Sequence, residues 1–339
     1  MVNVLIFIAF SVLAAHSAMA SELEVQPVRI ESRPLVLSAD DPSMDRVGSL
    51  HFLGGLILQS DDPSFGGWSS GLWSADLEDV LLVNDRGAFL FTTLQRVPES
   101  GAPLSLQASS AILPLRNSFG KPLSSAFNWD AEALTALPSG EILIAFERNH
   151  RILRYDLLGL VLLDAVELPP AVRSLPLHAA NRGLEALALA PDGQTLIAFL
   201  EGPEEAGGTS AFITQLQDGS ADDWTLRRYP QSGDYGVTDA AFLANGDLLV
   251  LERFFSVETG PLIRVRRLTA EVLDAAGPLM GPVLAELSRP LAVDNYEVLL
   301  TGVGAEGQTL LLLLSDDNFR DNQRSLLLLF ELLEEHAGG

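Results

Sequence analysis

Carboxylates recur in this chain at the start of one short strand-like run and again at the end of the next. Four such sets are Glu132 with Glu147, Glu185 with Glu201, Asp239 with Glu252, and Glu297 with Asp316 and Asp317. A β-hairpin places the first residue of one strand beside the last residue of its partner, so each set meets at one edge of a sheet. If the hairpins surround an axis, these edges form a ring with an acidic mouth.

Carboxylates gathered without counter-charge repel each other, so they take raised pKa values, bind cations, or do both. Calcium suits such a site because it accepts six to eight oxygen ligands in irregular geometry, and ligand type leaves magnesium and manganese open as alternatives. We therefore expect a divalent cation, calcium first, held by Glu132, Glu147, Glu185, Asp239, Glu252, Glu297, Asp316 and Asp317. The alternative is structural: a repeated carboxylate can accept backbone hydrogen bonds and tie neighbouring repeats together.

Arginines follow the second carboxylate in three repeats, as Arg86, Arg148 and Arg253. A guanidinium presents a planar fork to phosphate or carboxylate, so these arginines, with Arg182, are candidates for binding an anionic substrate. The other interpretation is an ion pair between neighbours on a loop, which contributes little. A metal beside anion-binding arginines favours hydrolysis of a phosphoester or other ester, and we assign catalysis to Glu132, Glu185 and Arg148.

The elements that position these residues repeat along the chain. The first-strand acids are separated by 185 − 132 = 53, 239 − 185 = 54 and 297 − 239 = 58 residues, and an earlier, looser copy surrounds residues 70–86. A period near 50 with four short strands per repeat predicts a β-propeller. We expect an all-β fold of five four-stranded blades, closed by residues 50–58 joining the last three strands. A six-blade alternative requires residues 25–30 and 50–58 to join separate sheets.

Composition limits the partners of the protein. The 339 residues carry a formal net charge of −24 and no cysteine, which argues against nucleic acid and excludes disulfides and zinc-thiolate sites. An apolar run over residues 4–15, followed by Ala18-Met19-Ala20, predicts a signal peptide over residues 1–20 and one propeller domain over 21–339. A membrane anchor is the alternative, although the run is shorter than a bilayer span. We expect an exported monomer, periplasmic or secreted, with no membrane contact after cleavage.

Several motifs resemble those of the phytase-like family of exported bacterial proteins, which is also called the esterase-like activity of phytase family. They are GGWSSGL over residues 66–72 with NDRG over 84–87, DAEAL over 130–134 with FER over 146–148, NRGLEAL over 181–187, and DNYE over 294–297 with SDDNF over 315–319. The resemblance implies a β-propeller with hydrolase activity on phosphoesters or other esters that depends on calcium. Propeller phytases also use lysines and arginines for phosphate, whereas Lys121 is the only lysine here. This departure favours a small anionic ester or phosphoester over phytate.

Two other functions use the same acidic mouth. One is a binding propeller without catalysis, in which calcium is structural. The other is a metal-dependent lactonase, since a propeller can place one divalent ion on its axis.

Overall fold

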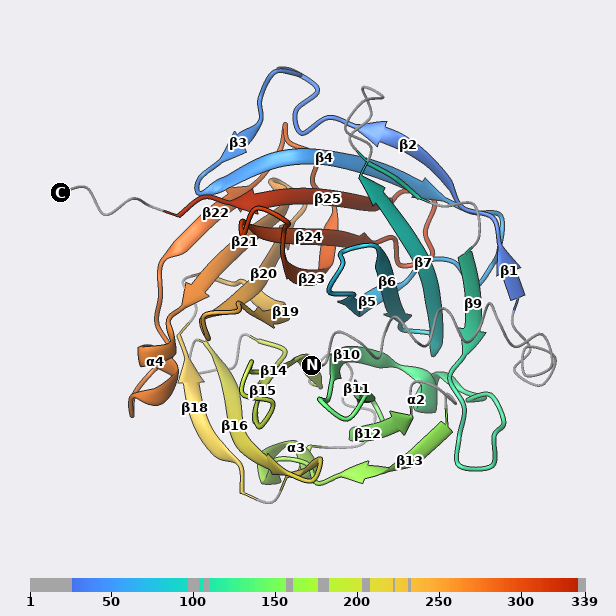
Figure 1. The fold of residues 1–339 in the computed structure, drawn as a ribbon, viewed down its shortest axis with the longest axis vertical. Helices are drawn as coiled ribbons and strands as arrows, with labels where there is room; N and C mark the ends of the chain where they lie inside the picture. The colour runs from blue at the N-terminus through green and yellow to red at the C-terminus, as the bar shows by residue number, and fades with distance from the viewer. Residues whose placement is uncertain are drawn as a thin grey trace.

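Five small antiparallel sheets surround a central axis in the computed structural model of the chain (Figure 1). The structure describes residues 26–96, 104–106, 110–156, 161–175, 183–202, 208–221, 223–230 and 233–334. The expected signal peptide over residues 1–20 therefore lies outside the described residues. In the part that is described, no helix is both long and apolar enough to cross a membrane.

Each sheet is a propeller blade, numbered here in chain order. Blade 1 contains β5 (Trp68–Trp73), β6 (Asp79–Asn84), β7 (Ala88–Arg96), β8 (Leu104–Leu106), β9 (Ser110–Pro114) and β1 (Gln26–Val28). Blade 2 contains β10 (Ala131–Ala136), β11 (Glu141–Phe146), β12 (Arg151–Asp156) and β13 (Val161–Val166). Blade 3 contains β14 (Leu184–Leu189), β15 (Thr195–Leu200), β16 (Thr209–Gln217), β17 (Ser220–Ala221) and β18 (Thr225–Tyr229).

Blades 4 and 5 complete the ring. Blade 4 contains β19 (Gly236–Phe242), β20 (Leu248–Ser256), β21 (Gly260–Leu268) and β22 (Val283–Leu287). Blade 5 contains β23 (Asn295–Val303), β24 (Thr309–Asp316), β25 (Ser325–Leu332), β4 (Leu50–Gln59), β2 (Glu31–Leu35) and β3 (Arg46–Val47). Three short helices lie between strands: α2 (Ala126–Trp129), α3 (Pro170–Arg173) and α4 (Ala270–Asp274).

The first hairpin of each blade follows directly from its sequence. Apolar runs of strand length flank turns in which Gly140, Gly193, Gly246 and Gly307 take positive φ angles between 73° and 91°. Glycine adopts this conformation without a steric penalty, so the turns fix the hairpin positions. The first strands, β5, β10, β14, β19 and β23, contact one another in sequence around the axis.

The ring closes as the sequence predicts. Strand β4, from the N-terminal part of the chain, pairs with the last strand β25 along its length, from Leu50 opposite Leu332 to Leu58 opposite Ser325. Strands β1 and β4 do join separate sheets, but each lies outside the three inner strands of an existing blade, so the blade count is five. The all-β propeller with five blades is confirmed.

The hydrophobic core is divided among the blade interfaces. Five apolar clusters each draw residues from two adjacent blades, such as Ile142 with Val83 between blades 2 and 1, and Ile197 with Val250 between blades 3 and 4. A blade therefore buries both faces only when its neighbours are present.

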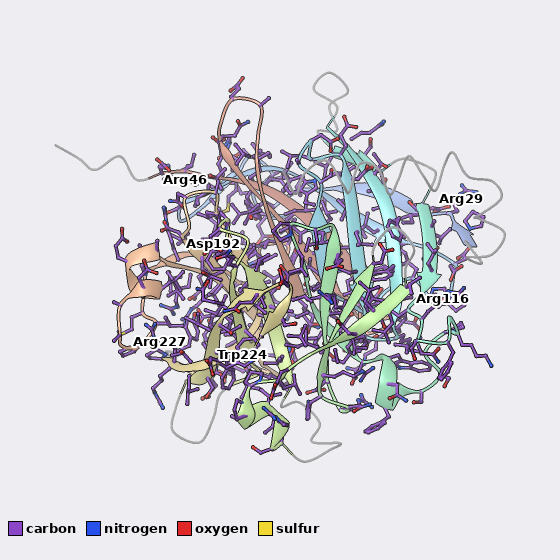
Figure 2. The ribbon with its side chains drawn as sticks, turned by 60° about the horizontal axis from the view of Figure 1, so that its bottom comes forward. Arg29, Arg46, Arg116, Asp192, Trp224 and Arg227 are labelled. Atoms are coloured by element: carbon purple, nitrogen blue, oxygen red, sulfur yellow. The ribbon has the colours of Figure 1, made fainter. Side chains whose placement is uncertain are left out.

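Polar contacts fasten the outer edges of the blades, among them those of Trp224 and Arg227, which are labelled in Figure 2. Arg227 on β18 donates to the carbonyl oxygens of Val272, Leu273 and Gly277, which surround α4 in the next blade. Trp224 Nε1 donates to the carbonyl of Glu167 beyond β13, at 2.9 Å. These contacts join blade 3 to blades 4 and 2, respectively.

Candidate active site

One residue bulges out of every innermost strand. The pairing of the first two strands of each blade skips a single position, where the first strand carries an extra residue; these positions are Ser69, Glu132, Glu185, Thr238 and Glu297. A bulge interrupts the alternation of side chains along a strand and turns one of them in a new direction. The repeated bulge therefore defines a first ring of side chains at the same end of all five blades.

A second ring lies one residue further along each second strand or directly after its end. Trp68, Ala131, Leu184, Val237 and Tyr296 precede the bulges and pair with Asn84, Phe146, Leu200, Glu252 and Ser315. The next residue in each case is Asp85, Glu147, Glu201, Arg253 and Asp316, respectively. Four of the five blades thus supply an acid here, and blade 4 supplies an arginine.

Both rings open into an axial cavity of about 730 Å³, which all of their residues except Thr238 line. Among the residues that the structure describes, nine carboxylates and five arginines line this cavity. The acids gather on blades 1, 2, 3 and 5, whereas Arg253, Arg289, Arg320 and Arg324 come from β20 and the loops that follow β22 and β24. The cavity is therefore acidic with a basic side, which is a suitable arrangement for a metal ion together with an anion.

Two groups of three carboxylates are close enough to hold a metal ion. In one group oxygen atoms of Asp130, Glu132 and Glu147 lie within 4.8 Å of one another, and in the other those of Glu147, Glu185 and Glu201 do so. Glu147 belongs to both and is held in place by the backbone N–H of Gly183, which donates to its Oε1 at 3.0 Å. Asp130 also accepts a hydrogen bond from Arg148 Nε. The first group is thus partly neutralised by an internal cation.

Several acidic oxygens in the cavity have no internal partner. Within the described residues, the buried atoms Glu201 Oε2 and Asp85 Oδ1 form no hydrogen bond. A buried, unpaired carboxylate oxygen is costly unless a cation or a proton satisfies it. These orphaned acceptors fit the oxygen-ligand chemistry of a divalent cation.

The pKa values of these acids are raised. Burial, followed by the charge of Glu147, raises the pKa of Glu201 to about 7. Burial and Asp130 raise the pKa of Asp85 to about 7, and burial with Glu297 raises that of Asp316 to about 9. Burial raises the pKa values of Glu132 and Glu185 well above the usual range. The charge of Glu185 adds to the effect on Glu132, and the charge of Glu201 adds to the effect on Glu185. Without a cation, the cavity therefore holds protons at neutral pH.

Blade 5 connects its two acids through an amide. Asn295 Nδ2 donates to Glu297 Oε1 at 2.8 Å and to Asp316 Oδ2 at 3.2 Å. Arg253 Nη2 lies 3.5 Å from the same Glu297 oxygen. These contacts orient Glu297 and leave part of the Arg253 guanidinium facing the cavity.

The structure brings six of the expected site residues to the axial cavity. They are Glu132, Glu147, Glu185, Glu297, Asp316 and Arg253. Arg148 also lines the cavity and pairs with Asp130. Arg86 lies outside it, with its guanidinium 3.3 Å from the ring centre of Phe319. Arg182 lies outside the described residues.

Three of the expected metal ligands lie elsewhere. Asp239 follows the bulge at Thr238 and does not line the cavity; its carboxylate accepts hydrogen bonds from the backbone N–H groups of Ala240 and of Leu299 on β23 in blade 5. Glu252, also one position out of register, is fully buried and pairs with Arg266 at 3.2 Å. Asp317 accepts from the N–H groups of Gly67 and Phe319 and from the Ser325 hydroxyl.

Asp239 should therefore affect stability and not cation binding. We expect Asp239→Ala to lower the free energy of unfolding by about 2–3 kcal/mol, because two buried N–H groups lose their acceptor. Calorimetric cation affinity should stay within about twofold of wild type. Glu306→Ala, at an exposed turn, is the control for unfolding. A large loss of cation affinity in Asp239→Ala without loss of stability would contradict this assignment.

Other cavity residues lacked a clear sequence signal. Four of them lie outside the strands, where the alternation of side chains does not predict which way a residue points. They are Asp130, which precedes β10, and the loop residues Arg289, Arg320 and Arg324. Glu201 and Asp85 did occupy the repeated second position. The bulge residue Thr238 follows Glu185 by 238 − 185 = 53 residues, the same spacing that separates Glu185 from Glu132, so equal spacing was the available signal in blade 4.

Comparisons with known proteins identify a family for this chain but no curated relative. No curated protein matches the sequence. A chain of the structure titled "Kuenenia stuttgartiensis Hydrazine Synthase" is similar over 75% of this chain and 78% of that chain, with 12% identity and a TM-score of 0.38. The profile of the phytase-like family, described as "Esterase-like activity of phytase", matches residues 63–319, which include all ten ring positions. The chain therefore belongs to the phytase-like family.

Proposed function

We propose that the protein is an exported hydrolase of ester or phosphoester bonds that uses a divalent cation, calcium first, in the axial cavity. The observation that carries this proposal is the sharing of Glu147 by two carboxylate groups in a cavity whose other side carries arginines. Membership of the phytase-like family supports hydrolase chemistry. Export rests on the N-terminal sequence, and a monomer is the proposed state.

The group of Glu147, Glu185 and Glu201 is the better candidate for the cation. The other group includes Asp130, which is already paired with Arg148, whereas Glu201 retains an unpaired buried oxygen. Burial, followed by repulsion between carboxylates, raises the pKa values of Glu185 and Glu201. A cation would satisfy the unpaired oxygen and favour the ionised form of both groups. When bound, the cation would polarise the ester or phosphoryl group and activate water.

The remaining residues of the cavity then have distinct roles. Arg253 and Arg148 would orient the anionic group, since each has N–H groups beyond those in its ion pair. Glu132 belongs to the group that contains Asp130. Burial, followed by the charge of Glu185 in the other group, raises its pKa, which favours a protonated carboxyl that can transfer a proton to the leaving group. We propose a small anionic substrate, because the net charge of −24 disfavours a polyanion such as phytate.

Calcium titration combined with turnover tests this function. We expect full-length protein freed of metal with EDTA to bind calcium in a calorimeter and, with calcium restored, to release p-nitrophenol from one of three probes: p-nitrophenyl phosphate, bis-p-nitrophenyl phosphate or p-nitrophenyl acetate. A lactone panel is run in parallel. Failure to turn over any probe with calcium, magnesium or manganese would reject the enzyme, and cation binding without turnover would favour a binding propeller.

A further inference from the structure

One hairpin rises above the rim of the axial cavity. In blades 1, 2 and 3 the second strand ends at Asn84, Phe146 and Leu200, respectively. Each of these residues pairs with the residue that precedes the bulge on the first strand. In blade 4 the equivalent position is Glu252, but β20 continues to Ser256. At about 3.3 Å per residue, those four extra residues extend the hairpin about 13 Å beyond the rim.

The extension presents an aromatic side chain to the cavity. Arg253 and Phe255 lie two residues apart on β20 and therefore on the same face, and both line the cavity. Pro261, directly opposite Phe255 on β21, lines it too. Phe254, on the other face, packs against Tyr235 with ring centres 5.8 Å apart. No such ring partner contacts Phe255 within the described residues, and 61% of its surface is exposed.

Other apolar residues continue this wall downward. Leu291 and Val293, in the loop between β22 and β23, line the same cavity as Phe255 and Pro261. The guanidinium of Arg289 lies under the hairpin turn, where a Cβ placed on Gly260 would be 3.1 Å from Arg289 Cζ. The cavity is thus lined by apolar side chains as well as by the arginines of its basic side. Together Phe255, Pro261, Leu291 and Val293 are named here the apolar wall.

We propose that the apolar wall is a substrate subsite, and that the substrate is an amphiphilic anionic ester whose alkyl or aryl group lies against Phe255 while its charged head lies near Arg253. This inference rests on the proposed function and specifies its substrate class. The spacing supports it, since two residues of strand place Phe255 about 7 Å beyond Arg253, within reach of one small molecule. A purely polar ester would leave this surface in water.

Binding of non-hydrolysable alkylphosphonates, from methyl to hexyl, tests the subsite without turnover. With full-length protein and calcium, we expect the calorimetric Kd to fall about twofold per added methylene, half of the roughly fourfold gain for complete burial. Phe255→Ser should bring this factor close to one, and Phe255→Leu should keep an intermediate value. Phe119→Ser, which alters an 86% exposed aromatic residue outside the cavity, should retain the wild-type dependence.

The outcomes separate this inference from the proposed function. A Kd independent of chain length, absence of phosphonate binding, or a dependence that survives in Phe255→Ser would overturn the subsite, even if p-nitrophenyl phosphate is hydrolysed. A chain-length dependence that Phe255→Ser removes would support the subsite, even if no probe is turned over. Self-association of the wild type that Phe255→Ser abolishes, with the chain-length dependence unchanged, would identify the hairpin as a protein contact and reject the proposal.

Discussion

Glu147→Gln is expected to weaken cation binding by about a hundredfold or more and to reduce cation-dependent turnover by at least the same factor. Loss of an outer hydrogen-bonding partner alone costs 10–100-fold at metal sites, and Glu147 contributes to both carboxylate groups. The amide is neutral and offers calcium one carbonyl oxygen in place of a charged carboxylate, but this oxygen can still accept the hydrogen bond from the Gly183 N–H. The fold should therefore survive the change.

The matched control for this variant lies at the other end of the neighbouring strand β11. Glu141 begins β11 at the opposite end from Glu147 and bonds with the Ser139 hydroxyl at the turn. We expect Glu141→Gln to bind calcium and turn over substrate as the wild type does. Calorimetry gives the affinities and p-nitrophenol release gives the rates. A Glu147→Gln protein with unchanged calcium affinity would place the cation elsewhere.

Stability of the cation-free protein is expected to fall as pH rises. The pKa values of Asp85 and Glu201 are about 7 and that of Asp316 is about 9, whereas the unfolded chain has values near 3.8 and 4.5. Between these limits the folded protein binds more protons than the unfolded chain, so the free energy of unfolding decreases with pH. From pH 5.5 to 8.5 we expect the free energy of unfolding to decrease by about 2 kcal/mol. At about 2–4 °C per kcal/mol, Tm should then fall by roughly 4 to 8 °C.

Calcium should reverse this loss where the acids are ionised. Because protons and cations compete for the same carboxylates, the calcium-induced rise in Tm should be larger at pH 8.5 than at pH 5.5. Differential scanning calorimetry of EDTA-treated protein measures both effects. Asp316→Asn, which removes the group with a pKa of about 9, should flatten the pH dependence at its alkaline end. A Tm that rises with pH without calcium would contradict the repulsion described here.

The sequence repeat was sufficient to predict the blades. It was not sufficient to predict site residues whose direction depends on a shift of one position in strand pairing. Spacing and turn glycines predicted the five blades and their closure by residues 50–58. The carboxylate pattern selected Asp239 because it is an acid, but the bulge falls at Thr238. Since neighbouring strand residues face opposite sides, this shift of one position turns Asp239 and Glu252 away from the cavity. A bulge depends on how two strands pair, which hydrophobic alternation does not reveal.

The basic side of the cavity was hidden for a different reason. Arg289, Arg320 and Arg324 lie in loops between strands, and the direction of a loop side chain depends on contacts far away in the chain. Arg324, for example, is oriented by Asp294, 30 residues earlier. Arg86 shows the converse, because it occupies the repeated position after an acid but stacks on Phe319. Residue type alone did not distinguish these two cases.

The pairing of β4 with β25 determines when the cavity can exist during biosynthesis. Glu297, Asp316 and the three loop arginines belong to the last part of the chain, and their blade needs a strand made near the beginning. Blades 1 to 4 can acquire their hairpins as they emerge, but the two ends must meet before the acids surround one space. The carboxylate groups of blades 2 and 3 can therefore meet before synthesis ends, but the cavity with its basic side is complete only after the final step of folding.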